Sequence, residues 1–141
     1  MNKLELQKTA VEVRKGIVSA VHSAKAGHPG GSLSAADIFT YLYFEELHVD
    51  PKNPKDENRD RFVLSKGHTA PGYYSALAER EFFPVEDLLT LRHIGSYLQG
   101  HPDMKHIPGV DMLITFRSTE PLRMYVPHIR SIRSLKHLIS M

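Results

Sequence analysis

The sequence predicts an α/β domain whose sheet has only begun to form. Two observations support this fold class. Apolar residues recur at helical spacing as far as Leu47, and a short apolar run at 61–65 then follows a polar connection. Further helical segments come after that run, and alternation of helices with a buried strand is typical of α/β proteins. Only one strand is visible in the pattern, and one strand cannot make a sheet.

A long first helix is expected from Asn2 to about Lys25. Asn2 is a good N-cap residue, because its side chain can accept a hydrogen bond from a free N–H of the first turn. The apolar positions that follow recur in steps of three and four, which places them on one helical face. They are Ala10, Val13, Ile17, Val21 and Ala24.

A tight loop and a second helix are expected next. The loop spans 27–31, where glycine and proline interrupt helical structure. Ser34 then resembles an N-cap, with Asp37 at the third helical position in an acidic variant of the capping box. This helix is expected to end near Leu47.

The rest of the chain predicts one strand and shorter helices. Residues 50–60 are rich in proline, asparagine and charge and indicate a surface connection. The apolar run at 61–65 suits a buried strand. Helices are expected at 72–80 and 84–92, followed by an irregular stretch over 95–111.

Composition and charge exclude several classes of function. A net charge of +2 over 141 residues does not give the positive field of a nucleic-acid-binding protein. The absence of cysteine excludes disulfides, thiolate zinc sites and thiolate catalysis. No apolar run approaches the roughly 18 residues of a membrane span, and the first residues do not form a signal-peptide core. We therefore expect a cytoplasmic protein with neither nucleic acid nor membrane among its partners.

The charge divides the chain into two parts. Residues 1–112 hold 13 basic and 15 acidic residues, whereas residues 113–141 hold five basic residues and only Glu120 as an acid. The second part also lacks glycine, alanine, aspartate, asparagine and glutamine. We interpret 1–112 as the beginning of a domain and 113–141 as an unrelated basic tail, read out of frame or gained at a disrupted gene end.

Three histidines share a setting that favours ligand binding. His28, His68 and His101 each follow a glycine, where the backbone can turn sharply and approach a ligand closely. Imidazole can transfer protons near neutral pH and bind phosphate or sugar hydroxyls. His68 also follows the predicted strand directly, and α/β sheets bind ligands beyond the carboxyl ends of their strands. The alternative is that all three are surface turn histidines. Their separations of 40 and 33 positions match no local zinc spacing, so no metal site is predicted.

Three motifs in this order resemble the beginning of a transketolase. They are AGHPGGSLSAAD over Ala26–Asp37, DRFVLSKGH over Asp60–His68, and GHP over Gly100–Pro102. The resemblance covers residues 1 to about 112 and is closest to the N-terminal subunit of the split bacterial and archaeal enzymes. It implies the thiamine diphosphate-binding fold, in which helices flank a parallel sheet. Here that fold would be incomplete.

The resemblance also implies an activity and roles for the histidines. Transketolases use thiamine diphosphate and magnesium to move a two-carbon ketol unit between sugar phosphates, a reaction of the pentose phosphate pathway. His28 resembles the histidine that contacts substrate near the reacting centre and assists proton transfer. His68 resembles the histidine at the cofactor's diphosphate, and His101 the one that binds a hydroxyl of the donor sugar. The implied partners are a C-terminal transketolase subunit and a second copy of the chain.

The sequence departs from the family after Met112. Leu113–Arg117 stands where the family has a Thr-Gly-Ser-Leu-Gly-Gln-Gly-like segment, and the Gly-Asp-Gly motif that binds magnesium is absent. The glutamate that activates the cofactor lies on another domain or chain in the family. We therefore expect a truncated N-terminal piece of a transketolase, with no metal ligands of its own and no activity when alone.

Two other functions stay open at this point. In residues 113–141 a basic helical face could form a non-enzymatic module that docks a partner or a membrane. That face consists of Arg130, Arg133, Lys136 and His137. A small hydrolase or lyase could instead use the three histidines without a cofactor, but no motif identifies its nucleophile.

Overall fold

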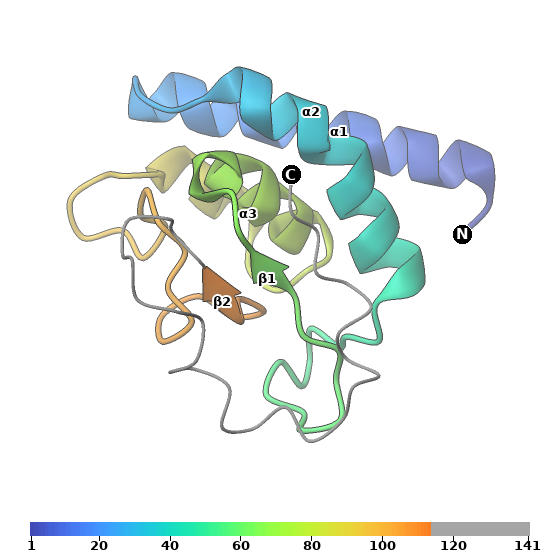
Figure 1. Ribbon diagram of the computed structural model, residues 1–141. Helices are drawn as coiled ribbons and strands as arrows, with labels where there is room; N and C mark the ends of the chain where they lie inside the picture. Colours follow the sequence, from blue (N-terminus) through green and yellow to red (C-terminus); the bar gives the residue numbers. More distant parts are fainter. Residues whose placement is uncertain (114–141) are drawn as a thin grey trace.

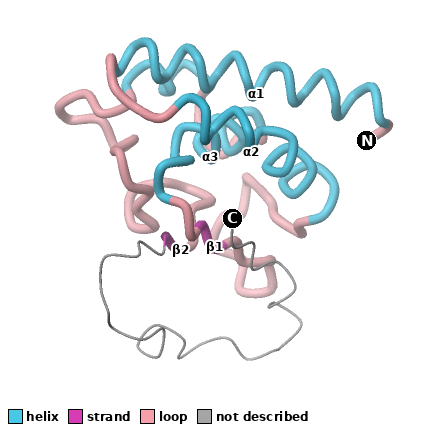
Figure 2. Tube along the Cα trace, turned by 45° about the horizontal axis from the view of Figure 1, so that its top comes forward, coloured by secondary structure: helices cyan, strands magenta, loops and turns pink. Residues whose placement is uncertain are grey.

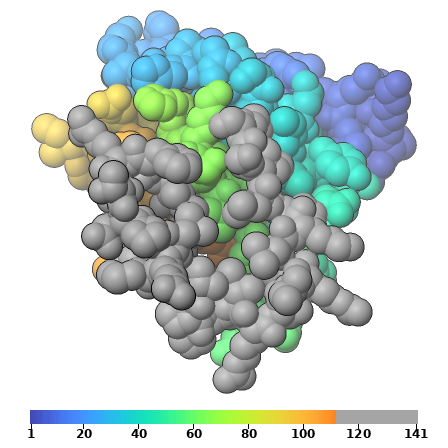
Figure 3. Space-filling view, viewed as in Figure 1, coloured from blue at the N-terminus to red at the C-terminus, as the bar shows by residue number. Residues whose placement is uncertain are grey.

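Residues 1–113 are described by the computed structural model, in which three helices pack above a small sheet (Figure 1). Helices α1 (Lys3–Ala24) and α2 (Pro29–Tyr41) run antiparallel to each other and form the upper layer. Helix α3 (Ala70–Glu79) packs beneath both of them, and the strands lie on its other side (Figures 1 and 2). In the space-filling view the α1–α2 layer covers one end of the molecule (Figure 3).

Helix α1 has the predicted boundaries because its caps are local. The Asn2 side chain accepts a hydrogen bond from the Glu5 N–H at 2.9 Å, and the Glu5 side chain accepts one from the Asn2 N–H at 2.8 Å. This capping box satisfies two N–H groups that the first turn leaves free. At the other end Lys25 adopts the left-handed conformation with φ 51° and closes the helix.

Helix α2 begins at Pro29, so the prediction of a loop through residue 31 and an N-cap at Ser34 was wrong. Pro29 occupies the first helical turn, where the lack of a backbone N–H in proline costs no intrahelical hydrogen bond. Ser34 lies inside the helix, and its hydroxyl donates to the Gly31 carbonyl at 2.8 Å. The residue before Pro29, His28, is the N-cap. The helix then continues as a π-helical turn over Leu42–Glu46.

The sheet within residues 1–113 has two parallel strands, β1 (Val63–Leu64) and β2 (Met112–Leu113). Strand β1 confirms the buried strand expected at 61–65, in a shorter form. Strand β2 was not predicted, because two residues at the end of an irregular stretch carry no periodic signal. The described part of the chain is therefore mostly helical with little sheet.

The remaining helices differ from the predictions in type and boundary. Helix α3 starts two residues before the predicted position, after the 3-10 turn η2 (Gly67–Thr69). The helix expected at 84–92 is the 3-10 segment η3 (Val85–Thr90). It cannot continue through residue 92, because Arg92 has a positive φ of 60°.

The core contains a cluster of aromatic rings between α2, β1 and α3. Phe62, directly before β1, contacts Phe39 and Tyr73 with ring centroids 5.9 and 5.2 Å away from its own. The Tyr43 hydroxyl donates to the Tyr73 hydroxyl at 2.9 Å, and Tyr73 donates to the Gly109 carbonyl at 3.2 Å. These bonds tie the π-helical turn after α2 and helix α3 to the segment that leads into β2.

Buried tyrosines predict a loss of stability at alkaline pH. Burial raises the pKa of Tyr43, Tyr73 and Tyr74 well above the usual value of about 10. A group whose pKa is raised by folding contributes stability below its unfolded-state pKa and loses it as pH rises further. We therefore expect the three tyrosines to contribute their full stabilisation below about pH 10. As the pH rises above that value, this stabilisation is lost and the protein should unfold.

A pH titration followed by tyrosinate absorbance and circular dichroism checks this expectation. The three buried tyrosines should ionise together with loss of helical signal. Ionisation of Tyr43, Tyr73 and Tyr74 near pH 10 with the helices intact would contradict the prediction.

Candidate functional site

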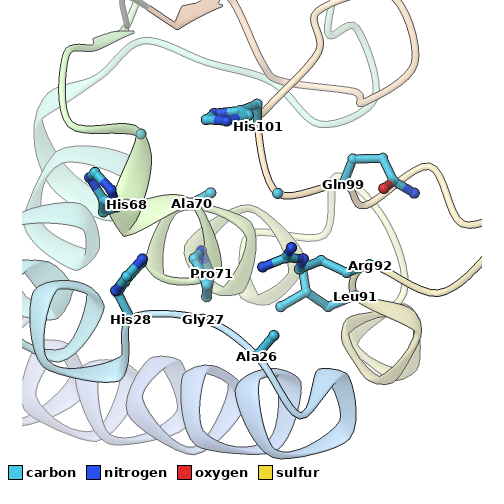
Figure 4. A pocket seen from close by; sticks show the side chains of 12 residues that line it. Ala26, Gly27, His28, His68, Ala70, Pro71, Leu91, Arg92, Gln99 and His101 are labelled. Carbon is cyan, nitrogen blue, oxygen red and sulfur yellow. The ribbon is translucent and has the colours of Figure 1, made fainter. Parts of the chain in front are cut away.

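One pocket of about 440 Å³ brings the three predicted histidines together. Three chain segments form it: the loop after α1, the turn that starts α3, and the loop before Pro102 (Figure 4). Its lining residues are Ala26, Gly27, His28, Gly67, His68, Ala70, Pro71, Leu91, Arg92, Gln99, Gly100 and His101. Residues that are distant in sequence thus face one cavity.

His28 and His68 lie at one end of the pocket and contact each other. Their ring centroids are 4.6 Å apart and the rings meet edge to face at 79°. The backbone of His28 caps α2, and its carbonyl accepts the Ser32 N–H at 3.3 Å. The side chain of His28 makes no capping bond, so it is available to the pocket.

His68 occupies the position that the sequence predicted, directly beyond the carboxyl end of a parallel strand. Residues Ser65 and Lys66 separate β1 from the turn η2, which carries His68 into the start of α3. The first turns of α2 and α3 both adjoin the pocket, at His28 and at Ala70–Pro71. Free N–H groups and the helix dipole favour anions at such ends.

His101 approaches from the other side of the pocket, on the long irregular stretch. Pro102 after it is buried, which anchors the loop. Asp103 follows and accepts hydrogen bonds from the Lys105 N–H and from His106. These bonds lower the pKa of Asp103. His106 is thus paired outside the pocket.

Sequence reasoning missed Arg92 and Gln99, which also line the pocket. The segment between them folds back on itself, because the Arg92 N–H donates to the Leu98 carbonyl at 2.8 Å. Arg92 precedes His101 by nine positions and follows no glycine, so the rule that selected the histidines could not find it. Among the described residues, no acidic side chain lines the pocket.

Residues 1–113 contain neither a metal-binding cluster nor a membrane-spanning helix. No three His, Cys, Asp or Glu side chains in that range come together in a way that could hold a metal ion. No helix in the same range is both long and apolar enough to cross a membrane.

The chain matches the family model of the transketolase thiamine diphosphate-binding domain over residues 6–122. Curated relatives agree with it. The chain is 43% identical over 110 residues to a 6-deoxy-6-sulfo-D-fructose transketolase subunit of a Clostridium species. It is 44% identical over 109 residues to an apulose-4-phosphate transketolase subunit of Phocaeicola vulgatus. These alignments cover 78% and 77% of this chain, but only 40% and 38% of those subunits.

Solved structures show the same relationship. Transketolase from Pichia stipitis, in complex with sedoheptulose 7-phosphate, matches with a TM-score of 0.69 and 39% identity over 74% of this chain. Transketolase from Campylobacter jejuni matches with a TM-score of 0.70 and 38% identity over 78%. The chain spans 16% and 17% of those two chains. The three glycine-histidine segments, the matching fold and the identity of about two residues in five together show that this chain belongs to the transketolase family, in its thiamine diphosphate-binding domain.

Proposed function

We propose that residues 1–113 form one wall of an active site that transfers a two-carbon ketol unit between sugar phosphates with thiamine diphosphate. The observation that carries this proposal is the meeting of His28, His68 and His101 at one pocket. Membership of the transketolase family supports it. The chain spans about two-fifths of the length of its subunit relatives. The complete transketolase activity is therefore part of this proposal.

The pocket fits the diphosphate group of the cofactor. The polar side chains that the described residues bring to it are imidazoles, a guanidinium and an amide, with no carboxylate to repel phosphate oxygens. His68, beside the first turn of α3, would hold the diphosphate. When bound, thiamine diphosphate supplies the electron sink for cleavage of a carbon–carbon bond. The magnesium that neutralises a diphosphate would be bound by groups outside residues 1–113, since that range contains no metal cluster.

His28 and His101 would act on the sugar. His28 lies against His68, so a substrate carbon at the cofactor would come close to its ring. An imidazole in that position can give or accept a proton at a reacting oxygen. His101 faces the same cavity from the opposite loop and would bind a hydroxyl of the donor sugar.

The proposal includes partners. Relatives at 43–44% identity are named as subunits, which favours a C-terminal transketolase subunit as the partner, together with self-association. The cytoplasmic location and the division at residue 112 stay predictions.

The alternatives have less support. The basic face expected to dock a partner or membrane lies at residues 130–137, outside the described residues, and the comparisons give it no support. A hydrolase without cofactor needs a nucleophile, and the lining of the pocket within residues 1–113 contains no serine, threonine or carboxylate.

Reconstitution tests the proposal. The chain is mixed with the C-terminal subunit of a split transketolase, thiamine diphosphate, magnesium, xylulose 5-phosphate and ribose 5-phosphate, and sedoheptulose 7-phosphate is measured. We expect product only when both subunits are present. The chain alone should also show no calorimetric binding of the cofactor. Micromolar, magnesium-dependent binding to the chain alone would contradict the placement of the metal ligands outside residues 1–113.

A further inference from the structure

The loop over residues 90–99 projects from the side of the molecule and carries an isoleucine in full contact with solvent (yellow, at the left of Figures 1 and 3). Ile94 is 106% exposed. Among the residues that the structure describes, the next most exposed large apolar side chain is Met104, at 62%. An isoleucine that no neighbour covers leaves its whole apolar surface in water, which is unfavourable unless another molecule buries it.

Hydrogen bonds within the loop hold it in one shape. The Arg92 N–H donates to the Leu98 carbonyl at 2.8 Å, and the hydroxyls of Thr90 and Ser96 bond to each other at 2.7 Å. Gly95, with a φ of 84°, lets the chain turn directly after the isoleucine. Because this shape is formed in advance, burying the isoleucine in a partner would cost little ordering entropy.

The segment that leads into the loop adds to the exposed apolar surface. Leu88 and Leu91 are buried and fix the segment to the core. Val85 and Leu89 are 42% and 50% exposed, and they lie within the same ten residues as Ile94. Three exposed apolar side chains on one anchored segment favour a contact with another protein.

The same loop forms part of the wall of the histidine pocket. Leu91 and Arg92 line the pocket before the isoleucine, and Gln99 and Gly100 line it afterwards. A chain that closes over this side of the pocket therefore lies next to the isoleucine. The described part of the chain brings neither a carboxylate nor a metal cluster to the pocket, so the proposed active site needs groups from elsewhere. The subunit that completes the site is thus placed to bury this side chain.

We propose that the loop over residues 90–99 is a docking site for the C-terminal transketolase subunit, with Ile94 as an anchor buried in an apolar socket of that subunit. This assignment rests on the proposed function. Residues 92–96 contain an arginine and a histidine but no acid, so a socket with acidic groups at its rim is complementary in charge. A few fully buried anchors carry most of the binding free energy of an interface.

Calorimetric titration of the full chain with the C-terminal subunit of a split transketolase tests this assignment. We expect Ile94→Asp to weaken association at least about tenfold, because it places a charge in the apolar socket. Ile94→Leu keeps an apolar side chain and should keep an affinity close to the native one. Leu4→Asp adds the same charge at an exposed apolar position in α1 and should leave the affinity unchanged. In the reconstituted reaction, activity that Ile94→Asp loses at a low concentration of the C-terminal subunit should return when that concentration is raised.

Each other result counts against the assignment. Equal affinity of the native chain and Ile94→Asp overturns it, as does equal weakening by Leu4→Asp. A lower unfolding temperature of Ile94→Asp, or a loss of activity that extra C-terminal subunit does not restore, would show that the isoleucine supports the loop or the pocket instead. Weakening of self-association alone, measured by analytical ultracentrifugation, would assign the loop to a second copy of the chain.

The same titration separates this assignment from the proposed function. If the native chain does not bind the C-terminal subunit, the proposed partner falls together with the docking site. If the native chain and Ile94→Asp bind that subunit equally well and form product at equal rates, the proposed function stands and only the docking site is removed.

Discussion

Replacing Asp111 by alanine is expected to lower the free energy of unfolding by about 3–5 kcal/mol. The Asp111 carboxylate is buried between the start of β1 and the start of β2. It forms an ion pair with the buried side chain of Arg59 and accepts the Phe62 N–H at 2.8 Å. Alanine would leave the buried Arg59 charge without its carboxylate, holding only the hydrogen bond to the Asp60 carbonyl, and the Phe62 N–H without an acceptor. Domains of this size have a total stability of about 5–15 kcal/mol, so much of it would be lost.

Urea denaturation followed by circular dichroism measures this effect. Asp111→Asn keeps an acceptor for Phe62 and should lose less stability than Asp111→Ala. The double change Asp111→Ala with Arg59→Met should recover part of the loss, because it removes the unpaired charge. The control is Asp37→Ala, which breaks an ion pair whose aspartate is 71% exposed and should cost less than about 1 kcal/mol. Equal effects of Asp111→Ala and Asp37→Ala would contradict the prediction.

Replacing His28 by alanine is expected to lower kcat/KM of the reconstituted enzyme by about 10²–10⁴-fold, the range of general acid–base catalysis. The substitution should leave the fold intact, because the His28 side chain does not cap α2 and is exposed in the pocket. The loss should appear mainly in kcat, since proton transfer belongs to the chemical step.

The control for His28 is His48→Gln, which alters an exposed histidine outside the pocket and should leave kcat/KM unchanged. Affinity for thiamine diphosphate in the reconstituted enzyme is measured alongside, because His28 also contacts His68. An activity of His28→Ala within a few-fold of the native value would remove His28 from the chemistry. A loss fully explained by weaker cofactor binding would make it a positioning residue for His68.

Features set by neighbouring residues could be predicted from the sequence. The capping box of Asn2 and Glu5 lies within one turn, and α1 has the expected ends. The glycine before each histidine is also a local signal, and it selected three residues that line one pocket. The start of α2 was missed because the rule that glycine and proline interrupt helices applies to helix interiors, whereas Pro29 lies in the first turn.

Features set by distant residues could not be predicted. Strand β2 consists of two residues and is positioned by its pairing with β1 and by the bonds of Asp111 to Arg59 and Phe62. Arg92 lines the pocket because its loop folds back onto Leu98. Neither relationship repeats along the chain, so no periodicity or short motif reports it.

The parallel pairing of β1 with β2 also determines when the site can assemble during synthesis. About 50 residues separate the two strands, so at roughly 5–20 residues per second β1 waits several seconds for its partner. Helices α1 and α2 can associate in that interval, since they are already made. The loop that carries Arg92 and His101 is synthesised late in this interval, and Asp111 is added shortly afterwards. Translation rate over this stretch thus sets how long the nascent chain presents an unpaired strand edge to its surroundings.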